Sequence, residues 1–246
     1  MRYFIEVCYN GTGFSGWQKQ LNAPSVQEEL EKSLATVLRQ SIEVVGSSRT
    51  DAGVHAEQQF AHFDTHTPIM DLGKVVHSLN LMLPKTIAVR GITPTKDDFH
   101  ARFEAIYRCY EYRIVRNKNP FLVHLATIFK GHLDVAAMND AASLLLQYND
   151  FECFSKTHTD VKTFVCYIEY AFWEERPGGQ LVFCIKSNRF LRGMVRAIVG
   201  TLLQIGQGRL TKAQFEQIIQ SKNRKNAAAQ AHAHGLFLTE VGYFFK

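Results

Sequence analysis

The stretch RYFIEVCYNGTGFSGWQKQLNAPSVQEELEKSLATVL, residues 2–38, contains the first strand and the first helix that the sequence predicts. Its first eight residues, Arg2–Tyr9, are rich in aromatic and β-branched side chains, which is typical of a strand. The glycine-rich segment Gly11–Gly16 then marks a loop. Ser25 and Glu28 form a capping box, and apolar side chains follow at helical spacing. A strand, a glycine loop and an amphipathic helix in this order indicate a mixed α/β fold.

The rest of the chain continues this alternation of strands and helices. The first half has the order β-α-β-β-α-β, and the second half repeats it with one additional helix. After residue 38 the predicted elements are strands 42–45 and 58–64, helix 72–82, strands 86–92 and 105–115, helix 134–148, strands 163–173 and 180–187, helices 190–205 and 211–219, and strand 236–244.

The order β-α-β-β-α-β is that of the ferredoxin-like split β-α-β unit, which RNA-recognition modules also use. We therefore expect an α/β protein of the α+β kind, with two ferredoxin-like, RRM-like halves, a mainly antiparallel sheet and a cleft between the halves. The seam is expected near residues 99–103, which divides the chain into an N-terminal half, 1–103, and a C-terminal half, 104–246. This order alone is equally compatible with a non-catalytic RNA-binding module.

Composition excludes several classes of protein. Of 246 residues, 46% are hydrophobic and 21% are charged, which is ordinary for a globular protein with a sizeable core. The five cysteines are scattered and never in C-x-x-C spacing, so neither a disulfide framework nor a zinc ribbon is indicated. No apolar run reaches about 18 residues and no signal-peptide core is present, so we expect a cytoplasmic protein without a membrane span. The net charge of +5 permits a polyanionic partner.

The stretch GSSRTDAGVHA, residues 46–56, is unusual because it is dense in polar and small residues between two predicted strands. Arg49 and Asp51 are two positions apart, so a turn could bring the guanidinium beside the carboxylate and keep the carboxylate ionised in a closed pocket. Gly53 would let the backbone approach a ligand closely. A hairpin loop with a surface Arg–Asp pair is the alternative that these residues leave open.

The same loop carries a family resemblance. Arg49–Ala56, RTDAGVHA, resembles the active-site motif of tRNA pseudouridine synthases of the TruA type. Asn10, Ser47-Ser48 and Cys153 depart from residues that are frequent in that family, which bears on substrate range more than on chemistry. Further ordered matches cover nearly the whole chain: Gly16-Trp17-Gln18, Ser25-Val26-Gln27, residues 97–103, Tyr110-Glu111-Tyr112, Asn149-Asp150-Phe151 with Phe154, residues 190–200 and Gly235–Leu238.

The resemblance implies roles for particular residues. Asp51 would be the catalytic carboxylate and nucleophile. Tyr110 would stack on the target base and is a candidate to help deprotonate C5, and Arg196 would pair with the aspartate. The remaining implied site residues are Arg49, beside the aspartate, and Leu236 and Leu238, either of which would line the uracil pocket.

Other basic residues suggest how RNA would be held. Arg102 and Arg108 belong to a basic cluster over residues 102–118. Arg192 precedes Arg196 by four positions, so the two would share one face of the predicted helix 190–205. We expect Arg102, Arg108 and Arg192 to follow the tRNA backbone, with an affinity that falls steeply as salt is added.

The implied chemistry needs no cofactor and no metal, because isomerising uridine transfers no electrons and no external group. The Asp51 carboxylate could attack the sugar, as in glycosidases, or C6 of the base, and a third route passes through a glycal. The resemblance also implies a homodimer that acts on uridines 38, 39 and 40 of the anticodon stem-loop. A pseudouridine synthase for another RNA stays open as an alternative, as does a glycosidase or nucleoside hydrolase, although no motif offers the second carboxylate that a hydrolase needs.

Two other signals favour ordinary structure over a binding site. Gly11–Gly16 fits G-x-G-x-x-G after a strand, but no helix begins directly after it, so a glycine-rich turn is favoured over nucleotide binding. His62 and His66 lie in a strand-like run, and His232 with His234 would need further ligands, so a metal site is not predicted.

Overall fold

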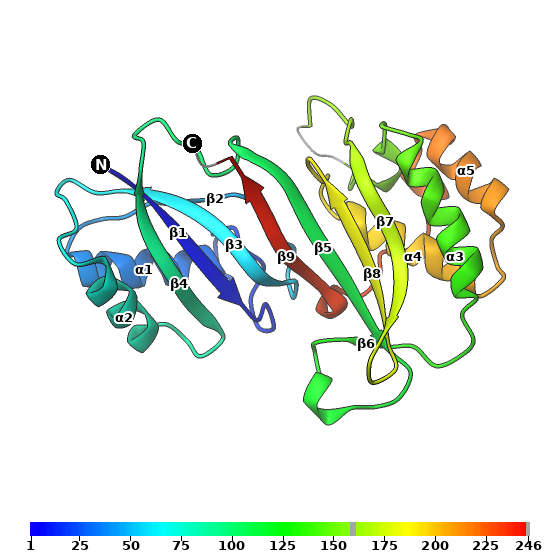
Figure 1. Cartoon of the computed structure of the whole chain (residues 1–246), viewed down its shortest axis with the longest axis horizontal. Helices are drawn as coiled ribbons and strands as arrows, with labels where there is room; N and C mark the ends of the chain where they lie inside the picture. Colours follow the sequence, from blue (N-terminus) through cyan, green and yellow to red (C-terminus); the bar gives the residue numbers. More distant parts are fainter. Residues whose placement is uncertain (158–160, 245–246) are drawn as a thin grey trace. The chain divides into compact units, whose positions relative to one another are not determined.

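The computed structural model describes residues 1–157 and 161–244 (Figure 1). Its contacts divide the chain into two compact units. The first comprises Met1–Ile106 and the segment that begins at Phe237, and the second comprises Tyr107–Leu236. The strands are mainly antiparallel and are combined with helices, which confirms the predicted α+β class.

The sheet of the first unit has the split β-α-β order. β1 (Arg2–Tyr9) lies between β4 (Ile87–Thr95) and β3 (His55–Asp64), and β2 (Val44–Gly46) pairs with the other edge of β3, all antiparallel. β3 thus separates β1 from β2, the two strands that the first helix connects. This arrangement confirms the ferredoxin-like order predicted for the first half. The two helices of the unit are α1 (Val26–Leu38) and α2 (Leu72–Met82).

The core of the first unit lies between its sheet and its two helices, which cover the same face of the sheet (Figure 1). Because side chains alternate along a strand, Ile5 and Val7 of β1 share one face, and both are fully buried. Leu30 and Leu34 of α1 and Leu79 of α2 are likewise 0% exposed. The apolar faces of both helices therefore pack on the alternating apolar face of β1.

An aromatic cluster lies on the opposite face of this sheet. Phe4 of β1 stacks on Phe60 of β3, with ring centroids 4.7 Å apart. Phe99 and Tyr243 each meet the Phe4 ring edge-on, at 5.1 and 5.0 Å. Tyr243 comes from the last strand of the chain, so this cluster ties the C-terminal segment to the first unit.

The predicted last strand forms as β9 (Leu236–Tyr243) and groups with the first unit. It runs parallel to β3, with Phe237 and Leu238 opposite the first two residues of that strand. β2 is only three residues long and pairs with Ala61–Phe63, near the end of β3. The beginning of the same edge of β3 is therefore left for β9.

The second unit repeats the split arrangement. β8 (Gln180–Ser187) lies between β5 (Ala105–Val115) and β7 (Ile168–Arg176), and both pairings are antiparallel. β6 (Thr127–Ile128) adds a short parallel pairing to the end of β5. The remaining elements are the helices α3 (Val135–Ala142), α4 (Met194–Gly206) and α5 (Lys212–Ser221), and the 3-10 turns Pro120–Leu122, Ser143–Leu146, Glu152–Phe154, Arg224–Asn226 and Ala233–Gly235.

β7 and α3 of the second unit are shorter than predicted. β7 begins at Ile168, because the residues before it pair instead with the loop around Asp150: Val165 bridges to Asp150, and the Cys166 N–H donates to the Asn149 carbonyl at 2.8 Å. α3 ends at Ala142 and continues as a 3-10 turn, so the predicted helical span changes its hydrogen-bonding pattern part-way.

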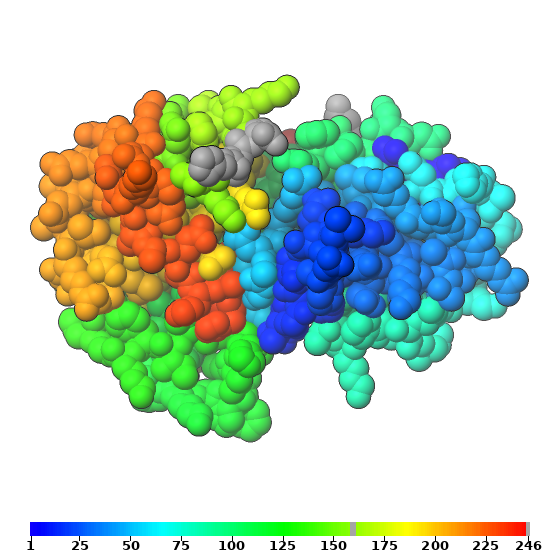
Figure 2. Space-filling view, turned by 180° about the vertical axis from the view of Figure 1, so that it is seen from behind, coloured from blue at the N-terminus to red at the C-terminus, as the bar shows by residue number. Residues whose placement is uncertain are grey.

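In the described part of the chain, no helix is long and apolar enough to cross a lipid bilayer. The residues of α1, in blue, lie at the surface of the first unit (Figure 2).

Candidate active site

Asp51 lies in the loop that connects β2 to β3, in the first unit. The loop turns tightly at this residue, because the Val54 N–H donates to the Asp51 carbonyl at 3.1 Å. Gly53, inside the turn, adopts a φ of 76°, which favours glycine. Asp51 is a half-buried residue and is carried on a defined turn.

The glycine-rich segment Gly11–Gly16 holds this loop in place. The Gly53 N–H donates to the Phe14 carbonyl at 3.2 Å, and the Trp17 N–H donates to the Thr50 carbonyl at 3.2 Å. Gly16 has a φ of 98°, and a Cβ at this position would overlap the Thr50 carbonyl. The segment is therefore a turn, as predicted. Sequence reasoning missed its second role, which is to hold the Asp51 loop through these close backbone contacts.

The residue before Asp51 is anchored in the core. Thr50 is buried, and its hydroxyl shares a buried hydrogen bond of 2.9 Å with the hydroxyl of Tyr9. At the start of the loop, the Ser47 hydroxyl donates to Gln59 Oε1 at 2.6 Å, and Gln59 Nε2 donates to the Ser48 carbonyl at 2.7 Å. The part of the loop that precedes Asp51 is thus fixed by buried and half-buried polar contacts, which limits the positions open to the carboxylate.

Arg49 does not form the pair with Asp51 that their spacing suggested. It is exposed, and no ion pair joins it to Asp51 among the residues that the structure describes.

Two other predicted site residues lie elsewhere in the first unit. Leu238 is fully buried on β9, opposite Ala56 of β3. Arg102 is exposed in the segment after β4, where its guanidinium lies 5.9 Å from the centre of the Phe103 ring.

Tyr110 lies on β5, and the second unit brings it against the segment that leads into α4. Its ring meets Phe190 edge-on, with centroids 5.1 Å apart, and it is 8% exposed. Arg108 lies two positions earlier, on the same face of the strand, and its Nη1 donates to the Asn188 carbonyl at 2.9 Å. Leu236, at the start of β9, is buried.

Arg196 lies in the first turn of α4, and its Nε donates to the Ala231 carbonyl at 2.7 Å. The predicted helical face shared with Arg192 is wrong. α4 begins at Met194, because Gly193 adopts a left-handed φ of 71° that a right-handed helix cannot continue through. Arg192 therefore lies, exposed, in the turn before the helix.

His55 is the first residue of β3, and its ring makes structural contacts. Its Nδ1 accepts a hydrogen bond from the Gly11 N–H at 3.0 Å, and its ring stacks on Phe237 with centroids 4.5 Å apart. His62 is also buried, and its Nδ1 accepts from the Ala101 N–H at 3.1 Å. No group of three or more His, Cys, Asp or Glu side chains within residues 1–157 and 161–244 is arranged to hold a metal ion.

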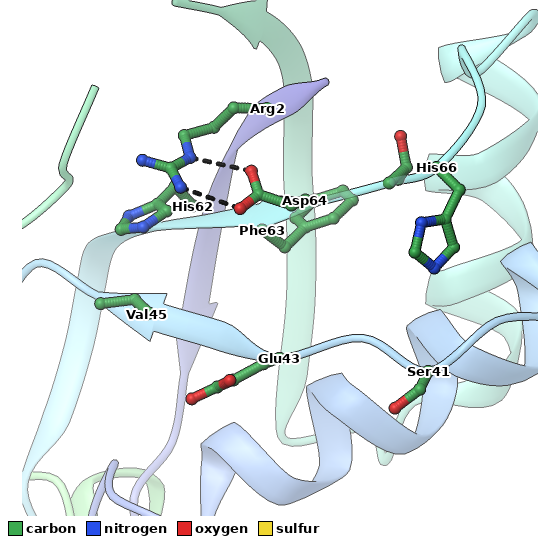
Figure 3. A pocket seen from close by; sticks show the side chains of 9 residues that line it. Arg2, Ser41, Glu43, Val45, His62, Phe63, Asp64 and His66 are labelled. Atoms are coloured by element: carbon green, nitrogen blue, oxygen red, sulfur yellow. Dashed lines mark hydrogen bonds and ion pairs between the residues drawn. The ribbon is translucent and has the colours of Figure 1, made fainter. Parts of the chain in front are cut away.

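A cavity of about 520 Å³ in the first unit lies away from the Asp51 loop (Figure 3). Its lining includes Arg2 and Asp64, whose side chains form two hydrogen bonds of 2.8 Å, and also His62. His62 and Asp64 lie at the end of β3, and Arg2 of β1 lies opposite Asp64. The Asp51 loop precedes the beginning of β3, so this ten-residue strand separates the loop from the cavity by roughly 30 Å. The Arg2 guanidinium holds the pKa of Asp64 below its usual value, so the charges of these two residues are already paired with each other.

Comparison with known proteins identifies the family. The sequence profile of the family described as tRNA pseudouridine synthase matches residues 7–104 and 141–243. The chain belongs to the tRNA pseudouridine synthase family. It is 48% identical to a protein of Parabacteroides distasonis over 98% of this chain and 96% of that one. It is likewise 48% identical to a protein of Porphyromonas gingivalis over 98% and 97% of the two chains. A protein of Chlorobaculum tepidum is 38% identical over 97% and 96%. All three relatives are named tRNA pseudouridine synthase A.

Most of the candidate site residues lie within the two segments that match the tRNA pseudouridine synthase profile, and two lie outside them. Asp51, Arg49 and Arg102 lie in the first matched segment, and Arg192, Arg196, Leu236 and Leu238 lie in the second. Tyr110 and Arg108 fall between the two segments. The expected role of Tyr110 therefore depends on the Tyr110-Glu111-Tyr112 resemblance, and that of Arg108 depends on the basic cluster over residues 102–118.

Proposed function

We propose that this chain isomerises uridine to pseudouridine in tRNA, with Asp51 as the nucleophile and uridines 38, 39 and 40 of the anticodon stem-loop as targets. Family membership over nearly the whole chain supports this proposal, as do curated relatives named tRNA pseudouridine synthase A. The reaction breaks the N1–C1′ bond and joins C5 to C1′. The C5 proton leaves and N1 gains a proton, so no redox partner and no group donor is consumed.

The observation that carries the proposal is the way in which the first unit presents Asp51. Asp51 is a half-buried residue that opens a tight turn, and the residue before it is fixed by the buried Tyr9–Thr50 bond. A nucleophile held in one place loses little freedom when it meets a substrate, which is a large part of enzymatic rate enhancement. Attack at C1′, attack at C6 and the glycal route all require a carboxylate placed in this way.

Tyr110 and Arg196 complete the proposed chemistry. A uridine in a stem must leave its stack before it can react, at a cost of about a few kcal/mol that aromatic stacking helps to offset. The edge-on contact with Phe190 supports a fixed orientation of the Tyr110 ring. Arg196 would pair with the catalytic carboxylate, and Leu236 or Leu238, both buried, would line the uracil pocket.

We propose that tRNA is held through basic side chains, in keeping with the net charge of +5. Arg102 and Arg192 are exposed, which suits contact with phosphates. Arg108 is 8% exposed and bonded to Asn188. It would therefore contact the RNA close to Tyr110, which lies on the same face of β5.

A homodimer and a cytoplasmic location also belong to the proposal. The family resemblance implies the dimer, and a tRNA substrate, which the relatives' names give, is in keeping with a cytoplasmic location. Analytical ultracentrifugation of the purified chain at micromolar concentration tests the dimer, and a species with the mass of a single chain would contradict it.

Tritium release tests the activity. Transfer RNA labelled at C5 of uridine is incubated in EDTA with wild type, Asp51→Asn or the control Asp140→Asn, which removes an exposed carboxylate paired with Lys212 on the surface. We expect release by wild type and by the control and none by Asp51→Asn, with tRNA binding retained by all three. Equal release by Asp51→Asn would reject the assignment of Asp51.

The assay also separates the rival functions. A non-catalytic RNA-binding module would bind tRNA without tritium release. A hydrolase would liberate free uracil, which chromatography of the products detects. A pseudouridine synthase for another RNA would leave a tRNA pool unchanged and release tritium from that RNA.

A further inference from the structure

The segment that follows α5 lies at the surface of the second unit, in orange-red in Figure 2. Part of it, Ala227–Ala231, runs along α4, and we call this part the strap. The Ala228 N–H donates to Thr201 Oγ1 at 3.2 Å, so a side chain in the middle of α4 satisfies the backbone of the strap. Gln230 Nε2 donates to the Gly193 carbonyl at 3.3 Å, just before α4 begins. The strap is thus bonded to both the start and the middle of the helix.

Two glycines allow the strap to lie directly on α4. A Cβ on Gly200 would overlap the Ala229 carbonyl, and a Cβ on Gly193 would overlap the Gln230 side-chain amide. At Gly200 the helix therefore meets the strap backbone to backbone, without an intervening side chain. Main-chain atoms cannot change rotamer, so this contact sets the separation of the two segments more firmly than a side-chain contact would.

Arg196 is held at both its backbone and its side chain by one residue of the strap. The Ala231 N–H donates to the Arg196 carbonyl at 2.9 Å, and Arg196 Nε donates to the Ala231 carbonyl at 2.7 Å. A hydrogen bond at Nε fixes the plane of the rigid guanidinium. Because the Nε–H is committed to Ala231, any pairing of Arg196 with a carboxylate runs through its two terminal amino groups.

A buried tyrosine packs close to this arrangement. Tyr112 of β5 is 0% exposed, and its hydroxyl shares a hydrogen bond of 2.7 Å with Thr127 Oγ1. Burial raises the pKa of Tyr112 to about 12, although the nearby charge of Arg196 acts in the opposite direction. The phenol therefore stays neutral at ordinary pH, and it offers Arg196 no competing anion.

We propose that the strap is the positioning element of Arg196, and that Thr201 and Gln230 are positioning residues which act on the reaction only by holding the strap against α4. The strap fixes the guanidinium through Nε and so aims its terminal amino groups. This inference rests on the proposed function, in which Arg196 pairs with the catalytic carboxylate. It adds residues that touch neither the base nor the sugar to the set that determines the rate.

The test uses Thr201→Val, which keeps the shape of the buried side chain and removes the acceptor for the Ala228 N–H. Single-turnover isomerisation with enzyme in excess should slow about tenfold, the equivalent of one hydrogen bond of about 1.4 kcal/mol. The dissociation constant for tRNA should change less than about twofold, because no RNA contact is removed. Thr201→Ser, which restores the hydroxyl, should recover the wild-type rate. Thr36→Val is the matched control, since the Thr36 hydroxyl bonds only within α1 at the surface of the first unit.

A double-mutant cycle shows whether the effect runs through Arg196. A lysine in Arg196→Lys has a single amino group, so it cannot bond the Ala231 carbonyl and also offer two amino groups to a carboxylate. Thr201→Val should therefore slow this variant no further. Equal slowing in both backgrounds would overturn the proposal, and so would a loss confined to tRNA affinity. If Thr201→Val does not fold, Gln230→Ala takes its place in the same cycle, with the same expected non-additivity.

The outcomes for this inference and for the proposed function are distinct. A wild-type protein that forms no pseudouridine rejects the proposed function. An active wild type in which Thr201→Val and Arg196→Lys act additively rejects only the positioning role of the strap.

Discussion

The hydroxyls of Tyr9 and Thr50 share a buried hydrogen bond of 2.9 Å, directly beside the residue on which the proposed reaction depends. Tyr9 is the last residue of β1, and Thr50 immediately precedes Asp51. The bond therefore couples the position of the carboxylate to the central strand of the first unit. Since both partners are buried, neither can exchange the other for water without cost.

Tyr9→Phe should weaken both stability and turnover. It leaves the Thr50 hydroxyl buried without this partner, so the free energy of unfolding should fall by about 1–3 kcal/mol in a urea titration. The isomerisation rate should fall as well, because the Asp51 loop gains freedom. Tyr148→Phe is the control, since that hydroxyl bonds Glu216 and Gln220 nearer the surface. A Tyr9→Phe protein as stable and as fast as wild type would show that the bond does not hold the loop.

Gly16→Ala should displace the Asp51 loop. The added Cβ would overlap the Thr50 carbonyl, and a displacement of about 1 Å at a reacting group can cost roughly 100-fold in rate. Gly178→Ala is a close control, because Gly178 also has a positive φ, of 84°, but has open space around it. Both variants carry the same kind of backbone strain, so only the overlap differs. Comparable activity of the two variants in the tritium assay would count against the role of Gly16.

Stability should fall on acidification because of His62. Burial, with the positive charges of Arg2 and His100, lowers the pKa of His62 to about 4, below the value near 6.5 in the unfolded chain. The unfolded state therefore binds more protons between these two pH values, so stability rises with pH across that window and is level above it. Melting temperatures measured from pH 4 to 7 should show a shallower acid slope for His62→Gln than for wild type. His77→Gln, at an exposed position, should keep the wild-type slope, and identical slopes for all three would contradict the prediction.

Binding of tRNA should weaken steeply as salt is added, because phosphate contacts release counterions. Arg102→Ala and Arg192→Ala should each reduce the slope of log affinity against log salt by roughly 1. Arg90→Ala should leave the slope unchanged, since Arg90 is already paired with Glu6 at 3.7 Å. Fluorescence anisotropy with labelled tRNA over a salt series measures the slopes. A flat wild-type titration would remove the electrostatic account of binding.

Local signals in the sequence predicted most elements of the fold. The Ser25 side chain accepts from the Glu28 N–H at the start of α1, and Thr211 with Gln214 forms a complete capping box at the start of α5. Such caps involve residues three apart, so neighbouring letters contain the whole signal. The same holds for the alternating apolar residues of β1.

Contacts between distant residues could not be predicted in this way. The bond between the Gly53 N–H and the Phe14 carbonyl joins backbone atoms, so no particular side chain is needed to form it and none signals it. The only available signal was the presence of glycines, since a segment without Cβ atoms can approach another closely. The start of α4 was missed for a related reason, because the left-handed Gly193 interrupts an apolar pattern that looks helical throughout.

The candidate site was found through a motif and not through its geometry. Asp51 was predicted from the resemblance of Arg49–Ala56. In the structure it lies on a turn that is held by hydrogen bonds from Gly53 and Thr50. The expected Arg49–Asp51 pair was inferred from spacing alone and is absent from the described residues. Spacing shows that two side chains could meet, whereas the turn decides the direction in which each one points.

The pairing of β9 with β3 has a consequence for how the protein matures during synthesis. Phe237 lies opposite His55, about 180 residues earlier in the chain, and stacks on its ring. A ribosome adds roughly 5–20 residues each second, so the edge of β3 that leads out of the Asp51 loop waits about 10 seconds or more for its partner strand. During that interval the nascent chain carries the proposed active-site motif, Arg49–Ala56, beside an unpaired strand edge. The unit that carries Asp51, the proposed nucleophile, is therefore complete only after β9 has been synthesised, and we expect activity to appear no earlier than that strand.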